Sequence, residues 1–401
     1  MLSKLLATSL LAASILTAPA LADFIAPKFD ISLKTPPKDR YDVAIRSQIN
    51  LHGWEYTYAP LLAYFEGTLG HEFYVKYDEQ LTSILEAYPQ EYKEELLGAY
   101  DTLIELGFGQ NITMGELVVL QLYYELNPFC TATLVNDPET GGILHGRNMD
   151  YSLPGLSNIT VTFTFLDEVS NKPIFQSTSF LGYGGVVTGM RIDGWTVQAN
   201  QRFKKEIPFV HSIIAALKGY RSIGFTLRDA LMAENSYAGA IEWLKGQKLI
   251  APIYIILGGL KAGEAVVITG DRDGVDESDE SNHGLAFMGD EDYDWFLVQT
   301  NYEPATHNGD GRKEFVEGEL SKVDCGDVTM DKIMEIMSTP PDLTTGTVYT
   351  TLMSAAVGTF EATVRTQDAE NEGVGAAGSG VSVSWPREFE QEVESRLSAR
   401  T

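Results

Sequence analysis

The chain contains 401 residues, of which 44% are hydrophobic and 21% charged, a composition that is ordinary for a globular protein and excludes wholesale disorder. Its 56 acidic residues outnumber the 29 basic ones, so that the formal net charge is −27 at pH 7. A surface this negative repels phosphate backbones, and we therefore expect no nucleic-acid partner. The same charge suits a protein that works at low pH, where many of its carboxylates are protonated.

The first 22 residues have the pattern of a secretory signal peptide. Lys4 supplies the positive charge, Leu5 to Leu16 form a short apolar run, and Ala20-Leu21-Ala22 is an A-x-A cleavage site in front of Asp23. The run is too short to span a membrane, and no later stretch of about 18 apolar residues follows it. We therefore expect a lysosomal or secreted protein. Two glycosylation sequons fit that route, and they begin at Asn111 and Asn158.

After a lead-in that contains proline and lysine (Pro27 to Lys38), residues 41–126 are predicted to be mainly helical. The apolar spacing predicts helices over residues 82–97 and 114–126. The second of these opens with a capping box formed by Thr113 and Glu116. A proline cannot continue a helix, so the helical pattern ends at Pro128.

Beyond this proline the pattern changes to that of β-strands. Residues 131–135 and 143–149 are predicted to be strands, and the turn residues 136–142 between them make the pair a hairpin. Further strands are predicted at 159–165, 196–199, 252–257, 265–269 and 295–299, and helices at 226–234, 237–246 and 330–337. A helical first quarter followed by hairpins, helices and more hairpins indicates an α+β fold rather than alternating βαβ units.

Several motifs for other chemistries fail. The chain has no H-E-x-x-H and no G-x-S-x-G, so neither a zinc site nor a serine nucleophile is supported. Gly373 to Gly378 matches G-x-G-x-x-G, but no strand precedes it, and we interpret it as a linker in a glycine-rich tail. Asp271 to Gly274 resembles the start of a calcium loop, yet Val275 stands where an oxygen ligand belongs. We expect neither a metal nor a cofactor.

The chain has only two cysteines, Cys130 and Cys325. In an oxidising compartment two cysteines usually form one disulfide, whereas the alternative is that one of them is a working thiol. Cys130 stands at the junction between the helical region and the hairpin, and the returning strand carries Arg147 and Asp150. A thiol with a guanidinium and a carboxylate on the neighbouring strand is a compact candidate for a nucleophile site.

The residues alone do not decide which group would act as the base for this thiol. His145 should point to the same side of the strand as Arg147, although we expect its role to be structural. A cysteine can instead use its own α-amine, which titrates near 8, if the preceding peptide bond is cut. Arg147 and Asp150 would face opposite sides of a straight strand, so a bulge or the strand end must bring them together. Otherwise they could form only a weak surface ion pair.

Between about residue 41 and residue 365, a series of short motifs occurs in the same order as in one known protein family. They are Tyr123-Tyr124-Glu125-Leu126, Cys130-Thr131, Ile143-Leu144-His145-Gly146-Arg147-Asn148-Met149-Asp150, Ile250-Ala251-Pro252-Ile253-Tyr254-Ile255-Ile256-Leu257-Gly258-Gly259, Val298-Gln299-Thr300-Asn301-Tyr302 and Thr347-Val348-Tyr349-Thr350-Thr351-Leu352. With them the chain resembles the acid ceramidase family, which includes the N-acylethanolamine-hydrolysing acid amidases. These are N-terminal-nucleophile hydrolases.

The resemblance implies an αββα sandwich with an N-terminal helical subunit, made as a precursor that cuts itself between Phe129 and Cys130. Residues 23–129 would form the helical fragment and residues 130–401 the catalytic fragment. Asp150 would hold the new α-ammonium of Cys130, and Arg147 would favour the thiolate and contact the carbonyl side of the substrate. Asn301 would donate to the oxyanion. Arg312 is transferred only by its place shortly after the Thr-Asn-Tyr motif.

Two features depart from the family. Gln201 stands where the family usually has a glutamate, which puts the tuning of cleavage and of its pH dependence in doubt. Family members also commonly join their two fragments by a disulfide. With Cys130 reserved as the nucleophile, Cys325 has no partner, and we expect the fragments to be held together by packing.

The resemblance implies hydrolysis of a lipid amide, with ceramide as the favoured substrate and sphingosine and a fatty acid as products. Met149, in place of the leucine common in the ethanolamide enzymes, favours ceramide. The alternatives are an N-acylethanolamine amidase and, from another class, a non-catalytic secreted lipid-binding protein. The partners implied are a membrane surface or a lipid-binding helper protein.

Overall fold

The computed structural model describes residues 22–122, 124, 128–151, 153, 155–203, 209–278, 283–290, 294–303 and 310–366. The expected signal segment, except for its last residue, lies outside this range, as do the glycine-rich tail and three residues of the Tyr-Tyr-Glu-Leu motif. None of the helices in the described ranges combines the length and the apolar character that are needed to cross a bilayer.

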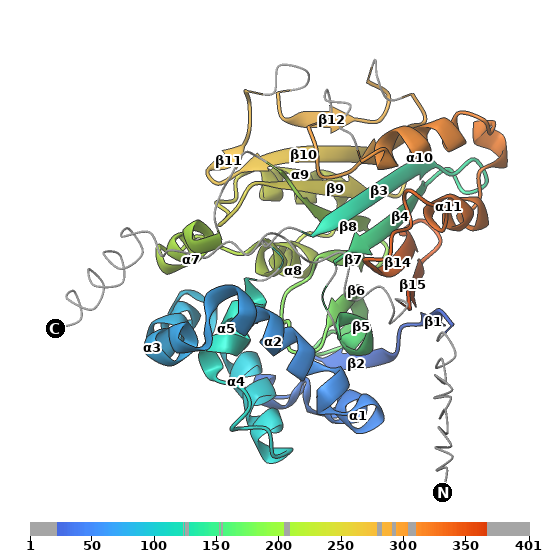
Figure 1. Cartoon of the computed structure of the whole chain (residues 1–401). Helices are drawn as coiled ribbons and strands as arrows, with labels where there is room; N and C mark the ends of the chain where they lie inside the picture. The colour runs from blue at the N-terminus through green and yellow to red at the C-terminus, as the bar shows by residue number, and fades with distance from the viewer. Residues whose placement is uncertain are drawn as a thin grey trace, which may run out of the picture.

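The first part of the described chain is helical and gathers at one end of the molecule (Figure 1). Its helices are α1 (Asp42–His52), α2 (Tyr58–Leu69), α3 (His71–Thr82), α4 (Gln90–Glu105) and α5 (Met114–Gln121). The capping box is confirmed, because the Thr113 hydroxyl accepts from the Glu116 amide at 3.1 Å while the Glu116 carboxylate accepts from the Thr113 amide at 2.7 Å.

The single helix predicted over residues 82–97 is wrong. Residues Ser83–Ala87 form a short 3-10 helix, and α4 begins only after Pro89. A proline removes one backbone donor and fixes its own φ, so it suits the start of a helix and not the interior of one. The amphipathic spacing therefore ran across two separate elements.

The nucleophile candidate lies in the first of two sheets. The described strands of this sheet are antiparallel and follow the order β1 (Phe24–Ile25), β15 (Thr359–Val364), β14 (Thr347–Ser354), β4 (Ile143–Asp150), β3 (Phe129–Asn136) and β13 (Phe296–Gln299). The predicted hairpin is confirmed as β3 and β4, in which Cys130 pairs with Met149 and Asn136 pairs with Ile143.

The second sheet covers the inner face of the first. Its described strands follow the order β11 (Gly274–Val275), β10 (Ala265–Asp271), β9 (Ile253–Gly258), β8 (Trp195–Gln201), β7 (Thr188–Arg191), β6 (Pro173–Phe180), β5 (Thr160–Leu166) and β2 (Lys28–Ser32), with β12 (Leu285–Phe287) paired to β10. The pair of β2 with β5 is parallel and the other pairs are antiparallel.

Helices cover the outer faces of both sheets, which confirms the αββα sandwich (Figure 1). α10 (Arg312–Leu320) and α11 (Met330–Met337) pack on the β3–β4 side, and α8 (Ile223–Ala233) and α9 (Tyr237–Lys245) pack on the second sheet. The remaining described helices are the short α6 (Leu156–Ile159) and α7 (Phe209–Leu217). Between the sheets, Leu134 and Ile143 belong to one buried cluster with Tyr254 and Ile256.

The lead-in has more structure than its sequence predicted. It supplies β1, which pairs with β15 at the edge of the first sheet, and β2, which pairs with β5 at the edge of the second. Edge strands are paired on one side only, so they can be short and weakly patterned, which hides them in a sequence. The described residues up to Phe129 are therefore not only a helical region but also part of both sheets.

Candidate active site

Cys130 lies near the start of β3 with its thiol fully buried. The Cys130 Sγ atom is 3.3 Å from the Tyr124 hydroxyl, 3.5 Å from Nη2 of Arg147 and 3.9 Å from the Met149 sulfur. Register explains the arrangement, because Met149 pairs directly with Cys130 and Arg147 is two residues further along the same strand. The structure thus brings the predicted thiol and guanidinium together.

Arg147 is a completely buried cation whose hydrogen bonds, within the described part of the chain, do not end on a carboxylate. It donates to the carbonyl of Ala199 at 2.8 Å, to Oδ1 of Asn200 at 3.1 Å and to the Tyr124 hydroxyl at 3.1 Å. A buried charge without a counter-charge is costly, and a thiolate beside it would supply one. The structure therefore places a buried cation next to the Cys130 thiol.

Tyr124 is a site residue to which the sequence assigned no role, although it belongs to one of the family motifs. Its hydroxyl donates to the carbonyl of Ala199, so its oxygen accepts from Arg147 and from the Cys130 thiol. Burial raises the pKa of Tyr124 well above its usual value, and the phenol stays neutral. It contacts the thiol from the segment that precedes the candidate cleavage site.

Asn301 and Arg312 hold the chain on both sides of Phe129. The backbone amide of Cys130 donates to Oδ1 of Asn301 at 2.7 Å, and Nδ2 of Asn301 donates to the carbonyl of Pro128 at 3.0 Å. Arg312 donates to the carbonyl of Cys130 at 2.9 Å and to Oδ1 of Asn301 at 3.0 Å. These hydrogen bonds hold the chain at Pro128 and at Cys130, so the peptide bond between Phe129 and Cys130 is clamped from both sides.

Asp150 lies on the other face of the hairpin from Arg147. Its Oδ1 accepts from the Thr347 hydroxyl at 2.6 Å, and its Oδ2 is 3.4 Å from Nη1 of Arg312. Burial raises the pKa of Asp150 to about 6, with Arg312 acting in the opposite direction. The ladder is irregular here because β14 has a bulge between Thr347 and Tyr349.

The expectation that a bulge would bring Arg147 and Asp150 together is wrong. The bulge lies in the neighbouring strand β14 and does not rotate β4, so the alternation of side chains is kept. A surface ion pair is also excluded, since both side chains are buried. Asp150 instead faces Arg312, which the sequence placed in the site only by resemblance.

Phe129, the residue before Cys130, is 43% exposed. Its ring lies edge-on to Phe203 with 5.1 Å between centroids, and the Arg312 guanidinium carbon is 5.6 Å from its centre. Gln201, at the position of the family glutamate, is buried nearby, and its carbonyl accepts from Nδ2 of Asn301 at 2.9 Å.

His145 has a structural role, as expected. Its ring nitrogens contact Oγ1 of Thr196 at 2.8 Å and Oε1 of Gln198 at 3.0 Å in the facing sheet. Burial lowers the pKa of His145 to about 3, so the imidazole is neutral. It pairs in register with Leu134, four residues along the strand from Cys130, which is too far to serve that thiol as a base.

Cys325 is remote from this site. Its sulfur lies 4.0 Å from the carbonyl of Asn136, at the opposite end of β3 from Cys130. Both thiols are free. Cys130 and Asn136 are six positions apart on the strand, which corresponds to roughly 20 Å, and no disulfide can bridge that distance.

The two sequons have different surroundings. Asn111 is exposed on the loop before α5. Asn158 is half-buried, and its side-chain nitrogen, the atom that glycosylation would modify, donates to the carbonyl of Tyr56 at 2.7 Å. Of the two, Asn111 is therefore the more accessible in the folded chain.

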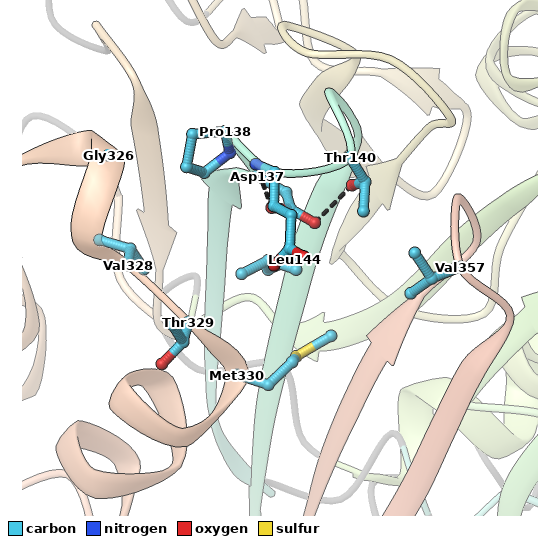
Figure 2. A pocket seen from close by; sticks show the side chains of 10 residues that line it. Asp137, Pro138, Thr140, Leu144, Gly326, Val328, Thr329, Met330 and Val357 are labelled. Atoms are coloured by element: carbon cyan, nitrogen blue, oxygen red, sulfur yellow. Dashed lines mark hydrogen bonds between the residues drawn. The ribbon is translucent and has the colours of Figure 1, made fainter.

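A hollow of about 490 Å³ lies at the turn end of the same hairpin (Figure 2). It is lined by Asp137, Pro138, Glu139, Thr140, Leu144, Gly326, Val328, Thr329, Met330 and Val357. The carboxylate of Asp137 accepts from the Glu139 amide at 3.0 Å and from the Thr140 hydroxyl, and it therefore stabilises the turn. The hollow is separated from Cys130 by the length of β3, so it is not the site of the thiol chemistry.

The suspected calcium loop is a β-turn. Asp271 and Gly274 pair with each other as β10 turns into β11, with Arg272 and Asp273 at the tip. Within the described ranges, no three His, Cys, Asp or Glu side chains gather in a way that could hold a metal ion.

The layered fold, with a buried thiol near the start of β3 beside the Arg147 guanidinium, is that of the N-terminal-nucleophile class, which includes amide hydrolases. Comparison with known proteins agrees. Over 308 residues the chain is 31% identical to acid ceramidase of Mus musculus, covering 72% of this chain and 73% of that protein, and it is 31% identical to the Homo sapiens protein over 306 residues with the same coverage. The chain belongs to the acid ceramidase family.

A solved structure of the Caenorhabditis elegans N-acylethanolamine-hydrolyzing acid amidase ortholog matches with a TM-score of 0.50 and 27% sequence identity. The match covers 57% of this chain and 93% of that one. The sequence matches no family model.

Proposed function

We propose that the chain is a self-processing cysteine amidohydrolase that cleaves ceramide into sphingosine and a fatty acid at acidic pH. The observation that carries the proposal is the clamped Phe129–Cys130 peptide, whose buried thiol lies 3.5 Å from the Arg147 guanidinium. The similarity to acid ceramidases supports the choice of substrate. We further propose that residues 1–22 direct the chain to a lysosomal or secreted location, with Asn111 as the better glycosylation acceptor.

Self-cleavage begins when the Cys130 thiolate attacks the carbonyl carbon of Phe129. The bond between that carbon and the Cys130 nitrogen breaks, the nitrogen takes up a proton, and Phe129 is left as a thioester on the sulfur. Water then hydrolyses the thioester, which releases the Phe129 carboxylate and restores the thiol. Arg147 stabilises the thiolate through its charge, and the neutral Tyr124 hydroxyl orients the sulfur.

The new α-amine of Cys130 then serves as the base for turnover. It takes the thiol proton, the thiolate attacks the ceramide carbonyl, and the α-ammonium returns the proton to the departing sphingosine amine. Water hydrolyses the acyl thioester to the fatty acid. Asp150, which stands opposite Phe129 in the ladder, would hold the α-ammonium. Asn301, freed from Pro128 by the cleavage, would donate to the oxyanion, a contact whose loss typically costs about 10²–10³ in rate.

We propose that the 23–129 fragment stays bound to the 130–401 fragment without a disulfide. Strands β1 and β2 of the first fragment pair with strands of the second. Glu95 of α4 and Arg228 of α8 form a buried ion pair, with Nη2 of Arg228 donating to Oε1 of Glu95 at 2.7 Å. Arg40 donates to the same carboxylate at 2.7 Å. The strand pairs and the Glu95–Arg228 ion pair join the two fragments, and Arg40, within the first fragment, holds the Glu95 carboxylate in place.

A lipid substrate implies a membrane surface or a lipid-binding helper protein as a partner. The net charge of −27 would repel anionic vesicles at neutral pH, and protonation of carboxylates would relax this repulsion. We expect anionic liposomes to bind the protein better at pH 4.5 than at pH 7.5. Equal binding at both pH values would contradict this part of the proposal.

Hydrolysis of N-acylethanolamines is the second candidate, and the match to the Caenorhabditis elegans structure favours it. The two candidates share every step at Cys130 and differ only in the amine that leaves. Turnover of ceramide and of an N-acylethanolamine with the same acyl chain, measured side by side at pH 4.5, separates them.

The test of the whole proposal is the fate of the purified precursor at acidic pH. We expect a reducing gel to show two fragments, the larger of which begins Cys130-Thr131-Ala132 in N-terminal sequencing. The Cys130→Ala variant should stay intact and inactive, whereas Cys325→Ala should process and turn over normally. An active Cys130→Ala variant would overturn the proposal, and a wild-type chain that never cuts itself would favour a non-catalytic lipid-binding protein.

A further inference from the structure

Asp342, which lies in the segment between α11 and β14, is a completely buried carboxyl group that the mechanism above does not use. Its Oδ1 accepts from the Thr131 hydroxyl at 2.5 Å, and its Oδ2 accepts from Nδ2 of Asn148 at 3.0 Å. Thr131 directly follows the nucleophile on β3, and Asn148 lies on β4. Asp342 therefore holds both strands of the hairpin from the outer face, behind the thiol.

The contacts of Asp342 continue into the catalytic machinery. The same Thr131 hydroxyl that donates to Asp342 accepts from Nη1 of Arg312 at 3.2 Å. That guanidinium nitrogen also donates to the carbonyl of Cys130 at 2.9 Å and lies 3.4 Å from Oδ2 of Asp150. One hydroxyl thus separates Asp342 from the group that clamps the candidate cleavage site.

The charges around Asp342 do not balance when every group is ionised. On β3 and β4 it faces the neutral Thr131 and Asn148 and the carboxylate of Asp150. From α10 it faces Arg312, which also binds Asp310 at 2.8 Å. A single guanidinium therefore serves three carboxyl groups, two of which are buried. Burial, together with the charge of Asp150, raises the pKa of Asp342 to about 7.

We propose that Asp342 is a positioning residue for the chemistry at Cys130. Its side chain anchors Thr131 and Asn148, and when this side chain is neutral, Arg312 is left to interact with Asp150 and with the Cys130 carbonyl. This inference rests on the proposed self-cleavage. The attack on Phe129 places a negative charge on its carbonyl oxygen. The Asp342 carboxylate is linked through Thr131 and Arg312 to the neighbouring Cys130 carbonyl, and its own negative charge would oppose the charge on that oxygen. The protonated side chain can donate to Thr131 and accept from Asn148, so it keeps both contacts without the charge.

The test compares the pH dependence of self-cleavage in purified wild-type, Asp342→Asn and Asp342→Ala precursors between pH 4.5 and 8. The amide variant mimics the neutral acid, because it too can donate to Thr131 and accept from Asn148. We expect it to cleave within a few-fold of wild type at pH 5 and to keep that rate at pH 8, where the wild-type rate has fallen about tenfold or more. The alanine variant lacks both contacts and should be slower at every pH.

Asp137→Asn is the matched control, since it removes a carboxylate at the turn end of the same hairpin and should keep the wild-type profile. If Asp342→Asn has the same pH profile as wild type, or is slower by one constant factor throughout, the positioning role is overturned while self-cleavage stands. If neither wild type nor Asp137→Asn cuts at any pH, the proposed function fails and this inference fails with it.

Discussion

The two faces of the β3–β4 hairpin carry opposite electrostatics although they are built from alternate residues of the same strands. On the inner face, toward the second sheet, the Cys130 thiol lies beside Arg147, and the described neighbours of this guanidinium include no carboxylate. On the outer face, toward α10 and α11, Asp150 and Asp342 surround Arg312. The two sets of side chains lie on opposite faces of one sheet and share no side-chain hydrogen bond among the described residues, although the charge of Arg147 still acts on the pKa of Asp150.

The difference shows how a fold can keep a charge available for chemistry. A guanidinium that contacts a carboxylate is already neutralised, whereas Arg147 has only neutral partners and the thiol. Side chains alternate across a strand, and Asp150 follows Arg147 by three positions. Its carboxylate therefore lies on the opposite face of the sheet. The Cys130 thiol therefore lies beside a guanidinium that donates to no described carboxylate. The four predictions that follow test this comparison.

The largest effect is expected from Arg147→Met. Self-cleavage and amide turnover should fall by about 10²-fold or more, because the thiolate loses the guanidinium that lies 3.5 Å from its sulfur. The melting temperature should not fall, since an uncompensated buried cation is replaced by an apolar side chain. Rates from gels and turnover assays, together with a thermal melt, measure both. Wild-type rates in this variant would contradict the proposed role of the inner-face charge. Arg46→Met, on the surface, is the control and should change neither the rates nor the melting temperature.

Replacing the outer-face arginine, Arg312, by methionine should lower the stability of the fold, in contrast to Arg147→Met. Arg312→Met leaves Asp150 buried without its cation, which typically costs about 3–5 kcal/mol. Urea unfolding in a Cys130→Ala background, where no cleavage intervenes, measures this loss directly. An unchanged unfolding midpoint would show that Arg312 does not compensate the outer carboxyls.

A smaller effect is expected from Tyr124→Phe. The variant loses one neutral hydrogen bond to the thiol, and kcat should fall by about two- to tenfold. Folding should be unaffected, because the carbonyl of Ala199 keeps its bond from Arg147 at 2.8 Å. A full kinetic analysis separates kcat from KM, and a change confined to KM would contradict an orienting role.

The smallest effect concerns stability against pH. The pKa values of Asp150 and Asp342 are raised by burial to about 6 and about 7 from an ordinary value of 3.8. The folded state therefore binds these protons more tightly than the unfolded state, so the stability they contribute is complete below about pH 4 and is lost as the pH rises to about 7. We expect the melting temperature of Cys130→Ala to fall by a few degrees over this range.

The Cys130→Ala/Asp342→Asn double variant is the control for that pH dependence. It lacks the titrating group with the higher pKa, so its melting temperature should fall less between pH 4 and pH 7. Parallel curves for the two variants would show that the overall negative charge, and not Asp342, sets the slope.

Local patterns predicted the element that carries Cys130. The turn residues 136–142 between two alternating runs, with Pro128 ending the helix before them, were enough to place Cys130 at the head of a hairpin. Strands β1 and β2 were missed because short edge strands carry little pattern of their own. The helix over 82–97 was predicted wrongly because the apolar spacing continued across Pro89.

The sequence by itself determined the hairpin and the spacing of Cys130, Arg147 and Asp150, because turn chemistry and two-residue alternation act between neighbours in the chain. Only the tertiary structure decided which partners each face receives. Arg312 and Asp342 come from elements 182 and 211 residues from the Cys130 carbonyl and the Thr131 hydroxyl that they contact. Such pairings depend on how helices pack on a sheet, for which no local pattern exists.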